Sequence, residues 1–475
     1  MDPVSGSFLL FTAAVVLIYY ALPRRARPPW LLIASLFFYL CSDLRYLFFL
    51  LFSAATTFLT GRALPASKRK KGLLALTLTL NLGLMAVLKL LPYSWDLAGR
   101  LLGLEHRTLH LIYPLGISFY TLSAASYVID VYRGKLAPER RFWRYGLFLC
   151  YFPIIIQGPI SRYGQLAPQL AEPHALSYKN LCFGAQLMLW GFFKKLVIAD
   201  RAALLVDLVY ASPGEYGGLA VPLAAALYVF QIYADFSGCV DILRGVSGML
   251  GVELIENFRR PFFSTSIAEL WRRWHISLGA WLRDYLYIPL GGSRKGRRRR
   301  NLNLLIVFFV SGLWHGAGVN FFFWGMLNGL YQVVGERTLP ARDRFWQSLG
   351  RKEAPRKLRQ LGCFAFFTFA AHFFRAPGLP AALRMLSASL RGLSPDLLQL
   401  GLDGADFAVL GLSLLFLLLV SFWQERLGGT PVRERLAALP LPLRWGVWLL
   451  GLLAVLVFGI YGPGYSSSQF IYMGF

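Results

Sequence analysis

Long apolar runs separated by short, mostly basic polar loops make up most of this 475-residue chain. Many runs approach the roughly 20 residues that a helix needs to cross a bilayer. The runs are continuous instead of alternating, and Leu and Ala dominate over β-branched residues, which argues against a membrane β-barrel. The pattern therefore predicts an all-α polytopic membrane protein with apolar spans at about 8–22, 30–41, 45–61, 73–91, 109–131, 180–198, 219–236, a hairpin at 302–336, and 361–375, 407–423 and 445–461.

The basic loops predict the orientation of these spans, because Lys and Arg are enriched in cytosolic loops. Basic clusters follow the first, third and fifth spans, and further clusters flank the hairpin. Their alternation predicts roughly twelve crossings, some re-entrant, with both termini outside the cytosol. The first span is expected to be retained, since its basic cluster follows the apolar run, unlike that of a signal peptide. We expect one membrane domain, divided into N-terminal helices (8–144), a catalytic core (145–337), C-terminal helices (338–461) and an extracytoplasmic tail (462–475).

Composition supports the membrane class and excludes others. The chain is 56% hydrophobic and only 15% charged, whereas soluble domains have about a quarter charged residues. The net charge of +25 is explained by basic loops beside membrane helices, so we do not expect nucleic-acid binding. The five cysteines are far apart and form no metal-binding motif, so neither a zinc site nor a disulfide framework is expected.

One histidine, His315, lies between two apolar runs of the hairpin. An ionisable residue in a hydrophobic span is a functional-site hypothesis, because burying such a group is costly. Trp314 and Gly316 flank it, so we expect an aromatic wall on one side of the imidazole and open backbone on the other. A low-dielectric site favours the neutral imidazole, which suits a general base.

A second irregular stretch is Tyr151 to Tyr163, which is apolar but interrupted by Pro153 and Pro159. Prolines at membrane depth need surrounding protein to satisfy the freed backbone groups. The stretch predicts a broken or re-entrant helix, in which Gln157 and Arg162 line an internal cavity. For Arg162, a position at the membrane interface explains the sequence equally well.

Two carboxylates lie at the end of the apolar run at 219–236, with Asp235 inside it and Asp241 just beyond it. Acidic residues at such depth usually pair with another group or face a cavity. A structural partner such as a nearby arginine is the favoured interpretation, and a direct part in the chemistry or substrate contact is the alternative.

The segment from Ser266 to Tyr285 predicts one amphipathic helix. Ser266 and Glu269 have the spacing of a capping box, and a row of Trp, Leu and Ile residues lies on one helical face. Taken alone, this is a helix at the membrane interface, with His275 at the edge of its apolar face. The basic residues at 294–300 are then an anchor at anionic headgroups or, alternatively, a contact for the phosphates of a cytosolic cofactor.

Four strings in this region resemble the membrane-bound O-acyltransferases. They are Asn257-Phe-Arg-Arg-Pro-Phe, Trp271-Arg-Arg-Trp-His-Ile-Ser-Leu, Trp281-Leu-Arg-Asp-Tyr-Leu-Tyr-Ile-Pro-Leu-Gly-Gly and Gly312-Leu-Trp-His-Gly-Ala. The resemblance is dense over about 150–335, and it is greater to the bacterial alginate and peptidoglycan O-acetylating type than to the teichoic acid D-alanyl type. It implies a ring of helices around a central tunnel, with His315 as the principal catalytic histidine and His275 as the second. Trp314, Asn320, Gln157, Arg162, Asp235 and Asp241 are then candidates for substrate contact.

The same resemblance implies a location in the bacterial cytoplasmic membrane and acetyl-CoA or an acyl-carrier thioester as donor. No metal is expected, because neither histidine has a metal-ligand partner at useful spacing. It further implies a secreted or membrane-anchored SGNH/esterase-like partner and an exported polysaccharide as final acceptor. The tail Phe470-Ile-Tyr-Met-Gly-Phe475 resembles a C-terminal signature of this branch, so Tyr472 is a candidate acyl relay, with simple docking of an apolar tail as the alternative. Two other functions stay open, D-alanyl transfer and transport of a lipid-linked substrate.

Overall fold

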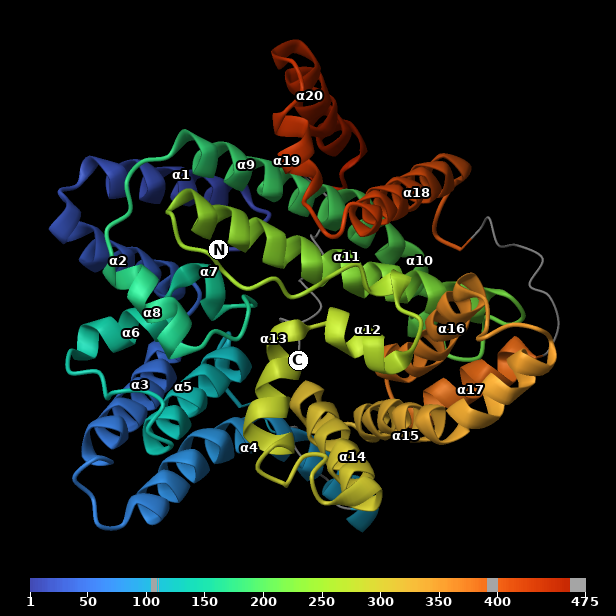
Figure 1. Ribbon diagram of the computed structural model, residues 1–475, viewed down its shortest axis with the longest axis horizontal. Coiled ribbons are helices and arrows are strands. Elements are labelled where there is room, and N and C mark those ends of the chain that lie inside the picture. Colours follow the sequence, from blue (N-terminus) through green and yellow to red (C-terminus); the bar gives the residue numbers. More distant parts are fainter. Residues whose placement is uncertain (104–108, 110, 391–399, 462–475) are drawn as a thin grey trace. The chain divides into compact units, whose positions relative to one another are not determined.

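The computed structural model describes residues 1–103, 109, 111–390 and 400–461, and every regular element in these ranges is a helix (Figure 1). The predicted all-α class is therefore confirmed. The described residues form two compact units, of which the first comprises 1–191 and 239–256 and the second comprises 192–238 and 257–461. The expected single membrane domain stays a prediction, and each unit is described by itself.

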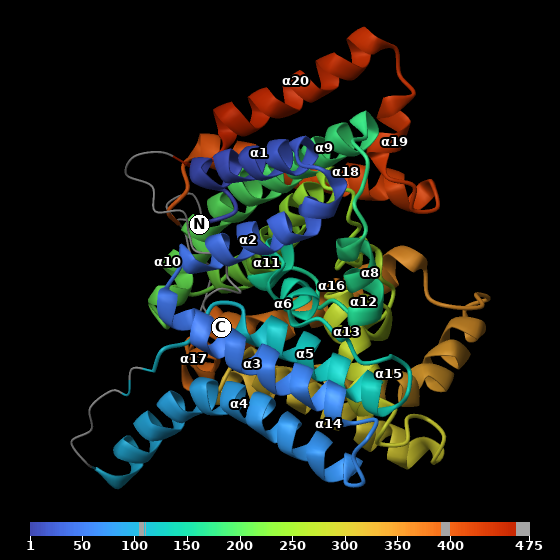
Figure 2. The same cartoon turned by 90° about the vertical axis from the view of Figure 1, so that its left-hand side faces the viewer.

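The first unit is built on long apolar helices, and α3, α4 and α5 pack side by side in it (Figure 2). Side-chain caps begin two of its helices, with Ser5 accepting a hydrogen bond from Phe8 N and Asp43 from Arg45 N. Its helices are α1 (Gly6–Ala21), η1 (Arg24–Ala26), α2 (Arg27–Leu40), α3 (Leu44–Ala63), α4 (Lys70–Leu102), α5 (Ile117–Tyr132), α6 (Phe142–Cys150), α7 (Phe152–Ile155), α8 (Tyr163–Ala171), α9 (Tyr178–Phe192) and the end of α11 (Ala220–Met249).

The predicted break around Pro153 and Pro159 is confirmed. Helix α7 is only four residues long, and the chain from Ile156 to Arg162 is not helical. Residues 151–161 are all buried. This agrees with the rule that irregular backbone at membrane depth is enclosed by protein.

The second unit holds both candidate histidines, and its most extensive helix pair is α14 against α15. Helix α9 continues through a π-helical turn, η2, into α10. The helices of this unit are η2 (Phe193–Ala199), α10 (Asp200–Ala211), the start of α11, η3 (Pro261–Phe263), α12 (Ile267–Arg273), α13 (Ile276–Leu282), η4 (Arg283–Tyr287), α14 (Gly296–His315), α15 (Val319–Ser348), α16 (Arg356–Arg375), α17 (Leu379–Ser389), α18 (Gly404–Arg426), α19 (Val432–Ala437) and α20 (Leu441–Phe458).

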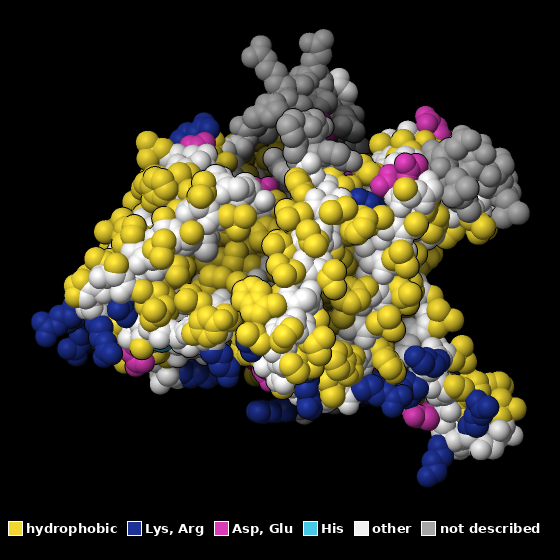
Figure 3. Space-filling model, turned by 90° about the horizontal axis from the view of Figure 1, so that it is seen from above, with side chains coloured by type: hydrophobic (Ala, Val, Ile, Leu, Met, Phe, Trp, Pro, Cys, Tyr) yellow, Lys and Arg dark blue, Asp and Glu magenta, His cyan; other side chains and the backbone are white. Residues whose placement is uncertain are grey.

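Six helices of the described chain are long and apolar enough to cross a membrane, so this is a multi-pass membrane protein. Hydrophobic side chains make up most of the face seen in Figure 3, as lipid contact requires. The other predicted crossings fall on shorter or more charged helices, such as α1 and the α14–α15 hairpin. The six helices are Leu44–Ala63, Lys70–Asp96, Tyr178–Ala211, Ala220–Met249, Gly404–Arg426 and Leu441–Phe458.

The prediction of one amphipathic helix from Ser266 to Tyr285 is wrong. Ser266 caps the start as expected, with its Oγ accepting from Glu269 N, but α12 ends at Arg273. Trp274 is extended and His275 has a φ of 45°, so a new helix begins at Ile276. The apolar face is also buried inside the unit, at Trp274, Leu278 and Trp281, and does not lie on a headgroup surface. Local periodicity could not show this break, because contacts with a distant segment produce it.

Some helix ends differ from the predicted spans, because charged residues that were assigned to a loop are also good helix formers. Helix α15 continues to Ser348, through residues that the basic composition assigned to a loop. Arg, Gln, Leu and Ala are good helix formers, so a run of charges does not end a helix. In the opposite direction, α5 begins at Ile117 instead of about residue 109, following Pro114 and a left-handed Gly116.

Candidate active site

His315 is the last residue of α14, and its side chain is buried within aromatic rings. Its imidazole centroid lies 4.8 Å from the ring of Trp314, 5.1 Å from Trp324 and 5.2 Å from Phe374, each near edge-to-face. Only 2% of the residue is exposed. Trp324 comes from α15 and Phe374 from α16, so three helices build this cage. The expected aromatic wall at Trp314 is confirmed, and two further walls are present.

The expectation of open backbone beside His315 is wrong at Gly316. A Cβ atom there would overlap the ring of Phe321, so this ring covers the glycine. The same hairpin is held close by glycines on both helices. A Cβ at Gly312 would lie 2.6 Å from the carbonyl oxygen of Phe321, and one at Gly325 would overlap the carbonyl oxygen of Phe308. Small residues at a helix interface let two backbones approach, which fixes where His315 stands.

His275 reaches the same aromatic cluster from the turn between α12 and α13. Its ring centroid is 5.8 Å from that of Trp314 and 4.8 Å from that of Phe236 on α11. It is also 2% exposed. Trp314 therefore contacts both imidazoles, and the two histidines singled out by sequence share one buried cluster in the second unit. Burial lowers the pKa of His275 to about 3, so its imidazole is neutral at physiological pH.

The turn at His275 is held by Asn257, which sequence analysis placed in a motif but gave no role. The backbone oxygen of Asn257 accepts from Ile276 N at 3.0 Å, and its side-chain Oδ1 accepts from Ser277 N at 3.0 Å. Two residues after Asn257, Arg259 N donates to the backbone oxygen of Arg273 at 2.8 Å. These bonds satisfy backbone groups that would otherwise belong to a continuous helix.

Asp235 has a structural partner, as the favoured interpretation of its position predicts, but this partner is a lysine and not an arginine. Lys195 Nζ lies 2.7 Å from Asp235 Oδ1 and 2.9 Å from Asp200 Oδ1, and all three side chains are less than 5% exposed. The neighbouring Lys194 donates to Ser237 Oγ at 2.8 Å. Sequence analysis missed this cluster, although two consecutive lysines inside an apolar span were the available signal. Removing one partner of such a buried ion pair is strongly destabilising. Substrate contact by Asp235 stays a prediction.

Three further candidates belong to the first unit, whose placement relative to the histidines is not determined. Gln157 is fully buried, and neither polar atom of its side chain has a hydrogen-bond partner among the described residues. Arg162 is half-buried at the start of α8. Asp241 lies 3.3 Å from Nη1 of Arg244, one turn along α11, so it too has a basic partner. Substrate contact by these three residues stays a prediction.

Asn320 stands near the start of α15, in the second unit, and is engaged with α16. Its Nδ2 donates to the carbonyl oxygens of Phe373 at 3.3 Å and Ala376 at 3.1 Å. These carbonyls belong to the end of α16, where a helix leaves acceptors without an intrahelical partner. Asn320 thus ties α15 to the helix that supplies Phe374. Its predicted contact with substrate is not tested by this geometry, and Tyr472 lies outside the described residues.

The model of the MBOAT, membrane-bound O-acyltransferase family matches residues 141–368, a range that includes both histidines. A peptidoglycan O-acetyltransferase of Helicobacter pylori is 32% identical over 423 residues, covering 82% of this chain and 79% of the relative.

The chain belongs to the membrane-bound O-acyltransferase family.

A probable alginate O-acetylase of Pseudomonas putida is 34% identical, with 89% of this chain and 88% of the relative covered. A teichoic acid D-alanyltransferase of Bacillus subtilis is 28% identical over 48% of this chain and 60% of its own length. The resemblance inferred from motifs is therefore confirmed, and the protein is a membrane O-acyltransferase. The shared segment of this O-acyltransferase covers the Asn257 turn, the α14–α15 hairpin and most of α16, which together surround the two imidazoles.

Proposed function

We propose that this O-acyltransferase passes an acetyl group from a cytosolic thioester to the far side of the membrane, for O-acetylation of an exported cell-surface polysaccharide. The observation that carries the proposal is the pair of buried imidazoles, His275 and His315, on one aromatic cluster through Trp314. A site that excludes water protects a thioester from hydrolysis and strengthens electrostatic interactions within it. The orientation of the chain in the bacterial cytoplasmic membrane, with both termini outside, is part of the proposal.

In this mechanism His315 is the general base. Its neutral imidazole takes the proton of an acceptor hydroxyl as the hydroxyl oxygen attacks the acyl carbonyl carbon. The C–O bond forms, the C–S bond of the thioester breaks, and the departing thiolate receives a proton, which leaves a free thiol and a neutral histidine. His275 orients the donor or polarises its carbonyl. General base catalysis of this kind contributes about 10²–10⁴-fold to a rate.

Acetyl-CoA is the proposed donor, and the names of the relatives support acetyl over D-alanyl as the group transferred. The O-acetylating relatives are 32% and 34% identical and cover more than four fifths of this chain, whereas the D-alanyltransferase covers less than half of it. The basic segment at 294–300, of which Arg294, Lys295 and Arg297 are exposed, is a candidate contact for the phosphates of the donor. Binding of coenzyme A, measured against binding of an acyl carrier protein, decides between the two donors.

The proposed route beyond the membrane uses Tyr472 and a partner protein. The phenolic oxygen of Tyr472 is a candidate to accept the acetyl group as an ester and to pass it to a secreted or membrane-anchored SGNH/esterase-like acetyltransferase. Tyr472→Phe removes one hydroxyl and little else. Loss of glycan acetylation with thioester binding retained supports the relay, and unchanged acetylation contradicts it.

His315→Gln tests the chemistry directly. We expect the variant to stay folded and to lose acetyl transfer by about 10²–10⁴-fold, because a glutamine cannot act as a base. The measurement is the release of free thiol from acetyl-CoA by purified protein with an acceptor, together with glycan acetylation in cells. Folding is checked by size-exclusion chromatography and thermal unfolding in detergent.

His372→Gln is the matched control, since His372 is a buried histidine with a structural role. Its Nδ1 hydrogen-bonds Tyr210 Oη at 2.9 Å and its Nε2 hydrogen-bonds the oxygen of Ala382 at 3.0 Å. We expect this change to lower thermal stability and to leave the rate per folded molecule near that of the wild type. Normal acetylation by folded His315→Gln would refute the mechanism, and transport of a lipid-linked substrate without thioester cleavage would point to the transporter alternative.

A further inference from the structure

The backbone at the His275 turn is strained, and a second residue nearby, Arg260, has a similarly strained backbone. Arg260 and His275, with φ values of 48° and 45°, are the residues other than glycine with positive φ in the described chain. A residue with a side chain is strained in this region of φ and persists there only where the surrounding structure over-determines it. Two segments, 257–260 and 273–277, meet here through the hydrogen bonds of Asn257 and Arg259. What holds these segments together therefore decides where the imidazole of His275 lies.

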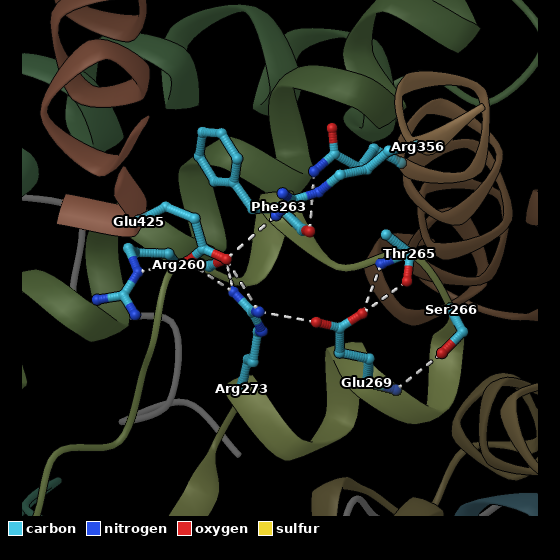
Figure 4. Close-up of polar contacts among 9 residues, drawn as sticks. Arg260, Phe263, Thr265, Ser266, Glu269, Arg273, Arg356 and Glu425 are labelled. Carbon is cyan, nitrogen blue, oxygen red and sulfur yellow. Dashed lines mark hydrogen bonds and ion pairs between the residues drawn. The ribbon is translucent and has the colours of Figure 1, made fainter. Parts of the chain in front are cut away.

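A carboxylate from a helix far along the chain contacts both segments (Figure 4). Glu425, near the end of α18, accepts from Arg260 Nε at 2.8 Å through Oε2. The same carboxylate accepts from Arg273 twice, at 3.1 Å from Nη1 and 3.2 Å from Nη2. Paired arginine–carboxylate bonds of this kind fix geometry as well as charge. Arg260 has one of the strained backbones, and Arg273 is two residues before the other.

The ion-pair cluster around Glu425 is partly shielded from solvent and contains more arginines than carboxylates. The side chains of Arg260, Arg273 and Glu425 are about one fifth exposed, so solvent weakens their interactions less than at an open surface. Glu269 pairs with Arg273 at 2.7 Å, and the more exposed Arg356 reaches Glu425 at 3.3 Å. Three arginines thus converge on one carboxylate. Loss of its charge would set Arg260 and Arg273 against each other across the turn.

We propose that Glu425 is a positioning residue for His275: by holding Arg260 and Arg273 together, it keeps the strained turn closed and the imidazole against Trp314. The effect on acyl transfer rests on the function proposed above, whereas the effect on the turn does not. The carboxylate of Glu425 contacts Arg260, Arg273 and Arg356, so its action on His275 is through the turn.

Glu425→Gln tests this with a readout that needs no enzymatic activity. The rate at which diethyl pyrocarbonate modifies His275 is followed by mass spectrometry on the full-length protein in detergent. In the wild type the imidazole is buried and reacts slowly. The variant should react several-fold faster, because the turn opens, while Glu425→Asp, which keeps the charge, should react at a rate closer to that of the wild type. The kcat of acetyl transfer should fall roughly 10- to 100-fold, with a smaller change in KM, as expected for a misplaced group.

Glu336→Gln is the matched control, since Glu336 pairs with Arg300 between α14 and α15, away from the turn. It should change neither the modification rate of His275 nor kcat. If Glu425→Gln does not fold, Arg260→Gln combined with Glu425→Gln removes one charge of each sign and gives the same two readouts.

Unchanged reactivity of His275 in a folded variant without Glu425 would overturn the proposal, whatever its activity. Faster modification with full activity, together with full activity of His275→Gln, would support the positioning of the turn and contradict the role of His275 in transfer. A failure of the positioning proposal can thus be distinguished from a failure of the proposed role of His275 in acyl transfer.

Discussion

At the scale of single residues, the neighbours of each buried histidine distinguish its roles. The ring nitrogens of His372 both hydrogen-bond to groups of the protein scaffold. His275 and His315 both pack against the ring of Trp314, which His372 is not seen to contact. Edge-to-face packing positions an imidazole while leaving its nitrogens to other partners. Burial lowers the pKa of His275, so its imidazole stays neutral.

The low pKa of His275 makes stability depend on pH in one direction. Its pKa is about 3 in the folded protein, against about 6.5 in an unfolded chain. Between these values the unfolded chain binds the extra proton, so acid favours unfolding, and the penalty reaches about 2 kcal/mol at pH 5. The melting temperature of the wild type should therefore fall between pH 7.5 and pH 5, and it should fall less in His275→Gln. An equal fall in both proteins would show that His275 is not held neutral by burial.

At the scale of elements, the helix break at His275 and the α14–α15 hairpin set the site. The break depends on Asn257, Arg259 and Glu425, which lie outside the segment that breaks. The hairpin depends on glycines. Their spacing can be read from the sequence, but the helix that each glycine faces cannot. Both elements bring imidazoles to Trp314, one from a turn and one from a helix end.

Two glycines of α15 give a matched test of the hairpin. Gly325 packs against the carbonyl oxygen of Phe308 on α14, whereas a Cβ at Gly335 on the same helix would meet nothing within 4 Å. Gly325→Ala should push the helices apart, lower the melting temperature by several degrees and reduce acyl transfer, because His315 shifts with α14. Gly335→Ala should be neutral or slightly stabilising, since alanine favours helix by up to about 1 kcal/mol. Equal behaviour of the two variants would show that close helix contact does not fix the site.

At the scale of the whole molecule, the apolar helices indicate that the chain crosses a membrane, and the basic loops predict its orientation. The helices are the evidence that the chain crosses a membrane several times. The excess of Lys and Arg in particular loops predicts the side on which each loop lies, because these residues are retained in the cytosol. The chemistry proposed here needs that orientation, since a cytosolic thioester and an exported glycan lie on opposite sides.

Cysteine labelling tests the orientation. In a variant without the five native cysteines, Ser293→Cys places a thiol in the basic segment before α14, and Ser467→Cys places one in the tail, outside the described residues. A membrane-impermeant maleimide should label Ser467→Cys in intact spheroplasts, and Ser293→Cys only after the membrane is opened. The reverse pattern would invert the predicted topology and, with it, the side on which the donor enters.

Hydrophobicity, proline positions and motif strings are local properties, so they were enough to predict the class of protein, the apolar spans, the broken stretch at Pro153 and two histidines as site candidates. The sequence by itself could not determine the break at His275, the lysine partner of Asp235 or the role of Glu425. Each of these depends on groups distant in the chain, whose contacts override local periodicity. The sequence predicted one helical face through His275, and only the tertiary structure, by supplying Asn257 and the arginine–glutamate cluster, turned that residue inward to Trp314.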